Sequence, residues 1–146
     1  MADKNAEKAE KRKQQALQQK YMEYQMSEQQ LKQFQEQLEK LDQQKNEAQA
    51  VGQALDDFNS SKDGDEVLVP ISGGIFFKTK RTEDRNFLVN VGAGIVVEKD
   101  IDGVKALVDN QVSEIAKYHS HLMAEFTKLA IRHQSIEEDL KRLVED

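Results

Sequence analysis

The sequence predicts a mainly α protein of the α+β class, in which a long antiparallel two-helix coiled coil carries two central β-hairpins. Three observations lead to this prediction. The chain of 146 residues is 33% charged and only 38% hydrophobic, which is too little apolar material for a single round core. Apolar residues recur with three-four spacing along both outer parts of the chain. The middle of the chain instead alternates with a period of two between glycine turns.

The first outer segment, residues 13–58, is predicted to be a coiled-coil helix that follows a flexible N-terminal tail, residues 1–12. The apolar positions of its repeat are Leu17, Tyr24, Leu31, Phe34, Leu38, Leu41, Ala48 and Leu55, and the remaining positions hold Lys20, Ser27, Lys45 and Gly52. Fourteen glutamines between residues 14 and 53 favour a helix with a solvated outer face.

A second coiled-coil helix is predicted over residues 100–146, with Asp100 as its N-cap. The apolar positions of its repeat are Ile101, Val108, Val112, Ile115, Leu122, Phe126, Leu129, Ile136, Leu140 and Leu143, and Lys105, His119 and His133 complete the series. Because the two helices are nearly equal in length, we expect them to pair antiparallel within one chain. The expected register places Tyr24 opposite His133, Leu38 opposite His119 and Gly52 opposite Lys105.

Residues 66–98 are predicted to form two β-hairpins, which turn at Ser-Gly-Gly (residues 72–74) and Gly-Ala-Gly (residues 92–94). Four short strands that no helix covers would leave apolar faces and strand edges exposed, so we expect them to mediate oligomerisation. The residues predicted to do so are Val67, Leu68, Val69, Ile71, Ile75, Phe76, Phe77, Phe87, Val89, Val91, Ile95 and Val97.

The residue content disfavours several classes of function. The sequence has no cysteine, which excludes disulfides and thiol catalysis. It has no apolar run near the roughly 18 residues of a membrane span and no pattern typical of a secretory signal. The net charge of −6 disfavours nucleic-acid binding, although the first twenty residues carry six basic and three acidic side chains, which we interpret as a solvated tail. We expect a cytoplasmic protein that binds neither membranes nor nucleic acid.

No motif indicates an enzyme. The sequence VGAGIV is similar to a dinucleotide-binding turn, but Val97 stands at the place of the third glycine and a strand follows. His119 and His121 point to different sides of a helix and His133 is distant, so a zinc site is not expected. We therefore expect no catalytic residues, no metal and no cofactor, and we interpret His119 and His133 as seam residues that bias the register.

The order of helix, hairpins and helix, with VLVPISGGIFFK (residues 67–78) and VNVGAGIVVEKDID (residues 89–102), resembles the alpha subunit of prefoldin, especially the archaeal kind. The resemblance covers nearly the whole chain, and the two glycine motifs with their flanking strands are its specific part. Two hairpins point to the alpha class, because the family's beta subunits have one. One departure is the first turn, which often reads Gly-Ala-Gly in the family and Ser-Gly-Gly here.

This resemblance implies a hexamer of two alpha and four beta subunits, in which the hairpins form part of an oligomeric β-barrel and coiled coils extend from it. It also implies an ATP-independent molecular chaperone, a holdase, that captures unfolded client proteins and hands them to a group II chaperonin. A gamma-type prefoldin that polymerises into filaments and a coiled-coil scaffold for one folded partner remain as alternatives.

The expected client-binding residues lie near the free ends of the two helices, at the coiled-coil tips. A non-native protein displays apolar segments of no fixed sequence, so its holder needs an adaptable apolar surface, for which methionine is well suited. The candidates are Leu17, Tyr21, Met22, Met26, Ile136, Leu140, Leu143 and Val144. The alternative is that these side chains only complete the coiled-coil seam.

Overall fold

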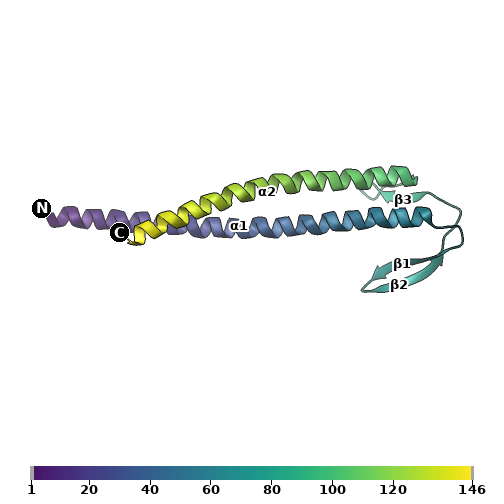
Figure 1. The fold of residues 1–146 in the computed structure, drawn as a ribbon, viewed down its shortest axis with the longest axis horizontal. Coiled ribbons are helices and arrows are strands. Elements are labelled where there is room, and N and C mark those ends of the chain that lie inside the picture. Colours follow the sequence, from purple (N-terminus) through teal and green to yellow (C-terminus); the bar gives the residue numbers. More distant parts are fainter. Residues whose placement is uncertain (1, 146) are drawn as a thin grey trace. The chain divides into compact units, whose positions relative to one another are not determined.

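The computed structural model describes residues 2–145, apart from the side chains of residues 70–72 (Figure 1). The elements are α1 (Ala2–Ser60), β1 (Glu66–Ser72), β2 (Ile75–Lys80), β3 (Phe87–Asn90), β4 (Val96–Lys99) and α2 (Ile101–Glu145). The predicted set of two long helices and two antiparallel hairpins is thus confirmed. The chain divides into two compact units, residues 1–42 with 117–146 and residues 43–116, and each is described by itself.

Helix α1 begins earlier than the sequence pattern predicted. The predicted tail, residues 1–12, is helical from Ala2 onwards. The physical reason is local, because alanine, lysine and glutamate are strong helix formers and Glu7 precedes Lys11 by four residues, which favours a helix. Every side chain from residue 2 to residue 16 is exposed, so this stretch is a solvated helix without an apolar seam.

Helix α2 begins as predicted, directly after Asp100. The Asp100 carboxylate accepts a hydrogen bond of 2.8 Å from the amide of Gly103, and the Asp100 carbonyl accepts one of 3.0 Å from the amide of Val104. Two of the free amides of the first turn are satisfied in this way. Asp102 in the same turn adds a negative charge at the positive end of the helix dipole.

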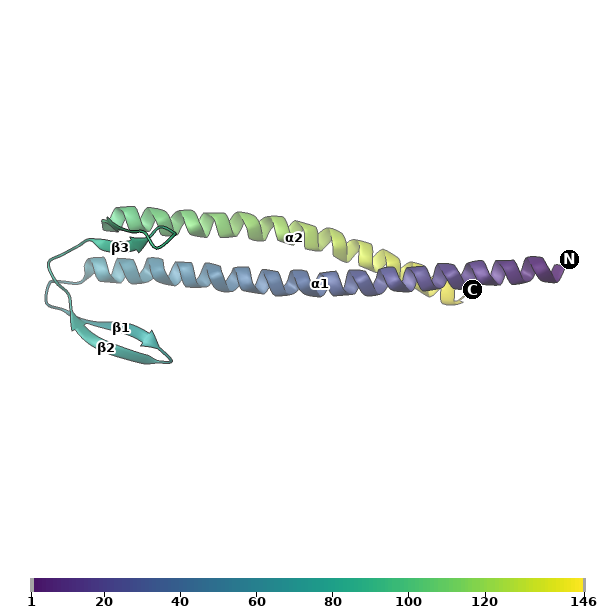
Figure 2. The ribbon, with the colours of Figure 1, turned by 180° about the vertical axis from the view of Figure 1, so that it is seen from behind.

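In the unit formed by residues 1–42 and 117–146, α1 and α2 lie side by side and antiparallel (Figures 1 and 2). Lys20 contacts Asp139, Ser27 contacts His133 and Asp42 contacts His119, so residue numbers rise on α1 as they fall on α2. All predicted seam positions in this unit are buried or half-buried, with Ser27, Leu41, Leu122 and Ile136 the least exposed. The three-four pattern therefore identified the contact face correctly.

The register agrees with the prediction at one pair and differs at two. Tyr24 stacks on His133 as predicted, with ring centroids 4.6 Å apart. His119 lies beside Asp42, one turn from the predicted Leu38, because its Nε2 atom is 3.3 Å from the Asp42 carboxylate. In the other unit, Gly52 faces Val108 instead of Lys105, and Lys105 pairs with Asp56 one turn along α1. His119 and Lys105 thus each contact an aspartate outside the seam.

The unit of residues 43–116 has its own small core. Leu55, Val104 and Val108 are buried at the ends of the two helices, and Phe87, Val89, Ile101 and Val112 pack against them. Strand β3 contributes to this core with alternate residues, and it lies along the start of α2 (Figure 2). The expectation that no helix covers the strands is therefore wrong for β3, because Phe87 and Val89 pack on the helix ends.

Both hairpins close at the predicted glycine turns. In the first, Glu66 pairs with Lys80 and Val69 with Phe77, and the register shifts between Pro70 and Ser72. Gly73 and Gly74 have φ values of 56° and 79°, in the left-handed region that tight hairpin turns require. In the second hairpin, Phe87 pairs with Lys99.

Candidate functional site

The predicted client-binding residues differ in their accessibility. Tyr21, Met22, Met26 and Val144 are between 53% and 70% exposed. Leu17, Leu140 and Leu143 are half-buried. Ile136 is only 4% exposed, so it is a seam residue that a client would reach only after the helices separate. The accessible part of the predicted site is therefore made by side chains next to the seam.

Two separate grooves flank the seam near these residues. Tyr21, Tyr24, Leu140 and Val144 line the first, a shallow hollow of about 350 Å³ with Glu137, Lys141 and Glu145 at its edge. Met26 and Ile136 line the second, of about 280 Å³, together with Glu23, Ser27, Gln30, Leu129 and Arg132. Because five residues turn a helix by about 140° beyond a full turn, Tyr21 and Met26 lie on different sides of the seam.

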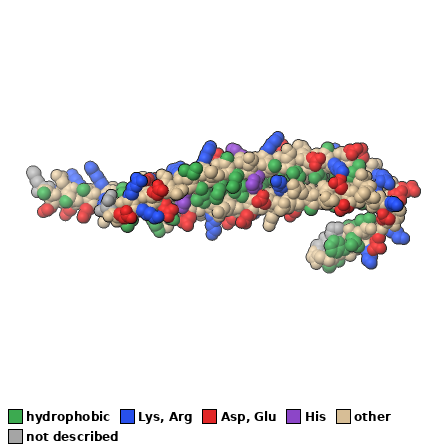
Figure 3. Space-filling model, in the orientation of Figure 1, with side chains coloured by type: hydrophobic (Ala, Val, Ile, Leu, Met, Phe, Trp, Pro, Cys, Tyr) green, Lys and Arg blue, Asp and Glu red, His purple; other side chains and the backbone are tan. Residues whose placement is uncertain are grey.

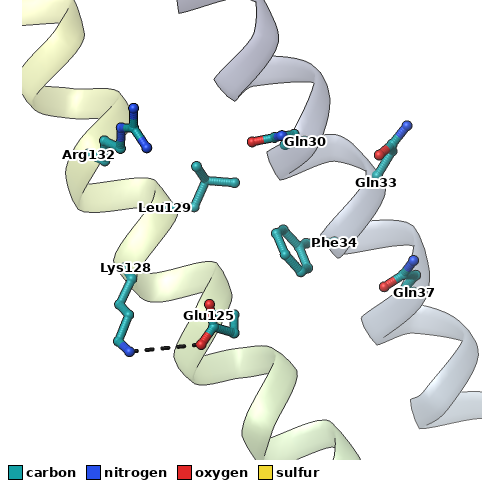
Figure 4. A pocket seen from close by; sticks show the side chains of 8 residues that line it. All are labelled: Gln30, Gln33, Phe34, Gln37, Glu125, Lys128, Leu129 and Arg132. Atoms are coloured by element: carbon teal, nitrogen blue, oxygen red, sulfur yellow. Dashed lines mark ion pairs between the residues drawn. The ribbon is translucent and has the colours of Figure 1, made fainter. Parts of the chain in front are cut away.

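A third groove lies next to the second, and Figure 4 shows the side chains that line it. It has a volume of about 450 Å³ and is lined by Gln30, Gln33, Phe34, Gln37, Glu125, Lys128, Leu129 and Arg132. Gln30, Leu129 and Arg132 line both hollows, so the two adjoin. We call the two hollows together, from Met26 to Gln37 on α1 and from Glu125 to Ile136 on α2, the flank groove.

Polar contacts hold the helix pair together between the grooves. The Ser27 hydroxyl lies 2.6 Å from Nδ1 of His133 and 2.9 Å from the carbonyl oxygen of Tyr24. Partial burial raises the pKa of the Tyr24 phenol, with smaller contributions from the carboxylates of Glu28 and Glu137. The ring therefore stays uncharged and presents an apolar face to the first groove.

Lys20 forms a second polar contact across the seam. Its Nζ atom lies 3.4 Å from a carboxylate oxygen of Asp139 and also 3.4 Å from one of Glu23. The hydrogen bond to Asp139 and the charge of Glu23 raise the pKa of Lys20. Exposed ion pairs of this kind stabilise by at most about 1 kcal/mol, so this end of the seam is held more weakly than one filled by leucine.

The hairpins keep a large apolar surface exposed. Leu68, Ile75, Phe76, Phe77, Val91 and Ile95 are between 49% and 62% exposed, and Val67, Val69, Phe87, Val89 and Val97 are half-buried. The side chain of Ile71 lies outside the described residues. Hydrophobic side chains gather visibly on the β1–β2 hairpin, whereas charged side chains cover much of the helices (Figure 3). An exposed apolar surface on short strands is typical of an assembly interface.

An apolar groove of about 610 Å³ accompanies this surface. It runs between the end of α1 and the two hairpins, and it is lined mainly by Val51, Ala54, Leu55, Phe58, Val67, Leu68 and Phe87. The groove lies beside the exposed strands, so its apolar lining extends the apolar surface of the hairpins.

Arg81 is a buried residue that the sequence analysis did not identify. It is 5% exposed, and its guanidinium donates hydrogen bonds to the Ser61 carbonyl and, at 2.8 Å, to the Ser61 hydroxyl. The guanidinium carbon lies 4.5 Å from the centre of the Phe58 ring, which also contacts the edge of Phe87 at 5.4 Å. Arg81 thereby joins the end of α1 to the first hairpin.

The local sequence explains why Arg81 fits there. The last turn of α1 contains no basic residue, so Arg81 supplies the cation that favours the negative end of the helix dipole. Its backbone amide donates to the Asp65 carbonyl, and its carbonyl accepts from Gly64, both at 2.9 Å. The available signal was a basic residue at a strand end, about twenty residues after a helix whose last turn has no basic residue.

Among residues 2–145, no group of three or more His, Asp or Glu side chains is placed to hold a metal ion. Neither helix in this part of the chain has a stretch apolar enough to cross a lipid bilayer.

Comparisons with known proteins agree with the geometry. A family model described as prefoldin subunit matches residues 27–146. The chain is 30% identical over 88 residues to prefoldin subunit alpha of Thermofilum pendens, and this match covers 60% of this chain and 68% of the relative. It is 36% identical over 70 residues to prefoldin subunit alpha 1 of Thermococcus kodakarensis, which covers 48% of each chain. The chain thus spans about half to two thirds of the length of these relatives.

A solved structure has the same fold. A chain of the cryo-EM structure of filamentous PFD from Methanocaldococcus jannaschii superimposes with a TM-score of 0.68 at 15% identity. The superposition covers 78% of the present chain and 94% of the other. The similarity shows that two long helices with β-hairpins between them are a fold found in solved structures.

Proposed function

Because the chain belongs to the prefoldin family, we propose that it is an alpha-type chaperone subunit that holds unfolded proteins without ATP and hands them to a group II chaperonin. Membership in the prefoldin family supports the role of a chaperone subunit. The holding activity, the client site and the chaperonin are our proposals, as is a cytoplasmic location without membrane or nucleic-acid partners.

The observation that carries the proposal is the exposed apolar surface beside a weakly held seam. Tyr21, Met22, Met26 and Val144 remain more than half exposed although a partner helix lies close by. Polar residues occupy seam positions between them, namely Lys20, Ser27 and His133. A surface that is apolar, adaptable and only moderately adhesive suits a client without a fixed sequence, and several such surfaces on one assembly gain through effective concentration.

We propose that the hairpins assemble this chain with beta-type subunits, two alpha with four beta, into a closed β-barrel. Support comes from the half-exposed phenylalanines of β2 and the apolar groove between α1 and the hairpins. Pairing of strand edges between subunits would cover both features.

The client site is tested by replacing Met22 and Met26 together by glutamine. If each methionine buries about half its surface on a client, each contributes about 1 kcal/mol, so the double variant should bind about 30-fold more weakly. Met123→Gln is the control, because Met123 is 47% exposed but lies outside the predicted tip residues. The measurement is suppression of aggregation of a denatured test protein by the chain assembled with a beta-type partner. Equal activity of the double variant and the control would place the client site elsewhere.

A filament-forming relative is the second candidate, because the chain shares its fold with a filamentous PFD chain. Exposed strand edges permit a closed ring or open growth, depending on whether the interface geometry closes. Size-exclusion chromatography with light scattering separates the two, since a ring gives one mass and a filament a distribution that grows with concentration.

A further inference from the structure

We propose that the flank groove is a second contact for unfolded proteins, in which an extended, partly apolar segment with an acidic side chain lies along the helix pair. This inference rests on the proposed function and adds a site beyond the tip residues. In this site, Phe34 and Leu129 would contact apolar side chains, the glutamine amides the peptide backbone, and Arg132 the carboxylate.

The groove has an apolar floor made by both helices. Phe34 from α1 and Leu129 from α2 point toward one another across it (Figure 4). Both are half-buried, so each keeps part of its apolar surface accessible. A client side chain placed between them would remove apolar surface of both helices from water.

One rim of the groove carries amide groups that suit a peptide backbone. Gln30, Gln33 and Gln37 line the groove from α1, and all three are exposed. Within residues 2–145, none of these three side chains forms a hydrogen bond with another group of the chain. Each amide offers two donor hydrogens and an acceptor oxygen, which matches the alternating N–H and C=O groups of an extended chain whatever its sequence.

The spacing of the glutamines also fits an extended segment. Seven residues of helix, from Gln30 to Gln37, rise about 10 Å, which equals the length of about three residues of extended chain. The part of the groove beside Met26 adds room for a similar length. The groove thus accommodates a short strand-like segment and no folded domain.

Arg132 is the charged side chain of the groove that suits an acidic residue of the bound segment. Lys128 lies 3.8 Å from Glu125, and Glu23 lies 3.4 Å from Lys20, which it shares with Asp139, so each of these groups has an ion-pair partner within the chain. Arg132 lines both parts of the groove and forms no ion pair with another described residue. Two acidic and two basic side chains line the groove, so its net formal charge is zero, but the planar Arg132 guanidinium is well suited to pair with a carboxylate.

The test places a photo-crosslinking phenylalanine derivative at Gln33 or at Gln35 in the full chain assembled with a beta-type partner. Both residues are exposed glutamines of α1, but only Gln33 lines the groove. The probe is reduced, carboxymethylated α-lactalbumin, which cannot refold. Crosslinking at position 33 should exceed that at position 35 at least about threefold; equal yields would overturn the inference.

A third crosslinking position, Met22, separates the two proposals. Crosslinking at Met22 without crosslinking at Gln33 would overturn the groove contact and leave the chaperone function standing. No crosslinking at any position, together with no suppression of aggregation, would overturn both.

Arg132→Gln tests the acidic part of the proposal separately. A fluorescent extended peptide with one aspartate between apolar residues should bind about threefold more weakly to the variant, whereas the same peptide with asparagine should bind both proteins equally. An equal loss for both peptides, or no loss for either, would contradict the role of Arg132. A circular dichroism melt shows whether the variant keeps its helices, which glutamine favours as much as arginine does.

Discussion

Ser27 occupies a seam position where a coiled coil usually carries an apolar side chain. It is buried, and its hydroxyl contacts the His133 ring and the Tyr24 carbonyl. A polar pair at such a position stabilises the helices less than two leucines would, but it favours one register because a shifted partner would leave the half-buried His133 ring without this hydrogen bond, while Ser27 would keep only its bond to the Tyr24 carbonyl. The pair thus contributes order at an end of the seam that is otherwise weakly packed.

Ser27→Ala tests this contribution. The variant removes the hydrogen bond to His133, so the free energy of unfolding should fall by about 1 kcal/mol. Ser135→Ala is the matched control, because Ser135 is exposed on α2 and alanine gives the same gain in helix propensity there. Chemical denaturation followed by circular dichroism measures both. A variant as stable as its control would show that the Ser27–His133 contact is neutral.

At the scale of elements, Arg81 connects three of them. Its guanidinium reaches the end of α1, its ring partner Phe58 touches Phe87 of β3, and its backbone closes the base of the first hairpin. The Nε atom of Arg81 has no hydrogen-bond partner among the described groups, although it is buried. A buried cation with one unsatisfied donor is maintained only if its remaining contacts outweigh that cost.

Arg81→Ala should therefore lower the free energy of unfolding by about 2–3 kcal/mol, because it removes charged hydrogen bonds and the contact with Phe58. Arg85→Ala is the control, since Arg85 is exposed and its pair with Asp63 at 3.5 Å should contribute less than about 1 kcal/mol. Hydrogen exchange at the Gly64 amide should accelerate only in the Arg81 variant. Similar effects of the two substitutions would refute the connecting role.

Features that depend on the spacing of neighbouring residues were predictable from the sequence. Features that depend on contacts between distant parts of the chain were not. Leu41, Leu122 and Ile136 were assigned to the seam because helical spacing alone places them on one face. Val104 is buried but was missed, since it lies off the repeat and is covered by β3. Arg81 was missed because its partners are twenty residues away.

The helix over residues 2–12 was missed for another reason. An apolar repeat was the criterion for a helix, and this stretch has only the propensity of its residues. The candidate site was predicted in part. Sequence spacing identified the exposed tip side chains, but their separation into two grooves depends on how each helix is rotated about its axis.

At the scale of the whole molecule, assembly should depend on one face of the first hairpin. Val67 pairs with Thr79 and Val69 with Phe77, so these four side chains share a face, whereas Lys78 lies on the other. The first face is mostly apolar, whereas the second mixes Leu68 and Phe76 with the charged residues Glu66, Lys78 and Lys80. An interface between subunits would therefore form on the first.

Phe77→Asp should prevent assembly with a beta-type partner, because a carboxylate would be buried without a counter-charge. Lys78→Asp, one residue along, should assemble normally, since its side chain is 77% exposed. Light scattering after size-exclusion chromatography gives the mass of each mixture. An assembly that tolerates aspartate at residue 77 but fails at residue 78 would reverse the assignment of the faces.

The solvated first stretch of α1, residues 2–16, has a practical consequence. All its side chains are exposed, and none lines a groove or belongs to a strand. A fluorescent dye or a surface linker attached there would sit on a helical backbone that is continuous with the rest of α1. It therefore offers a place to label the chain for distance measurements without occupying the surfaces that we propose for clients and for subunits.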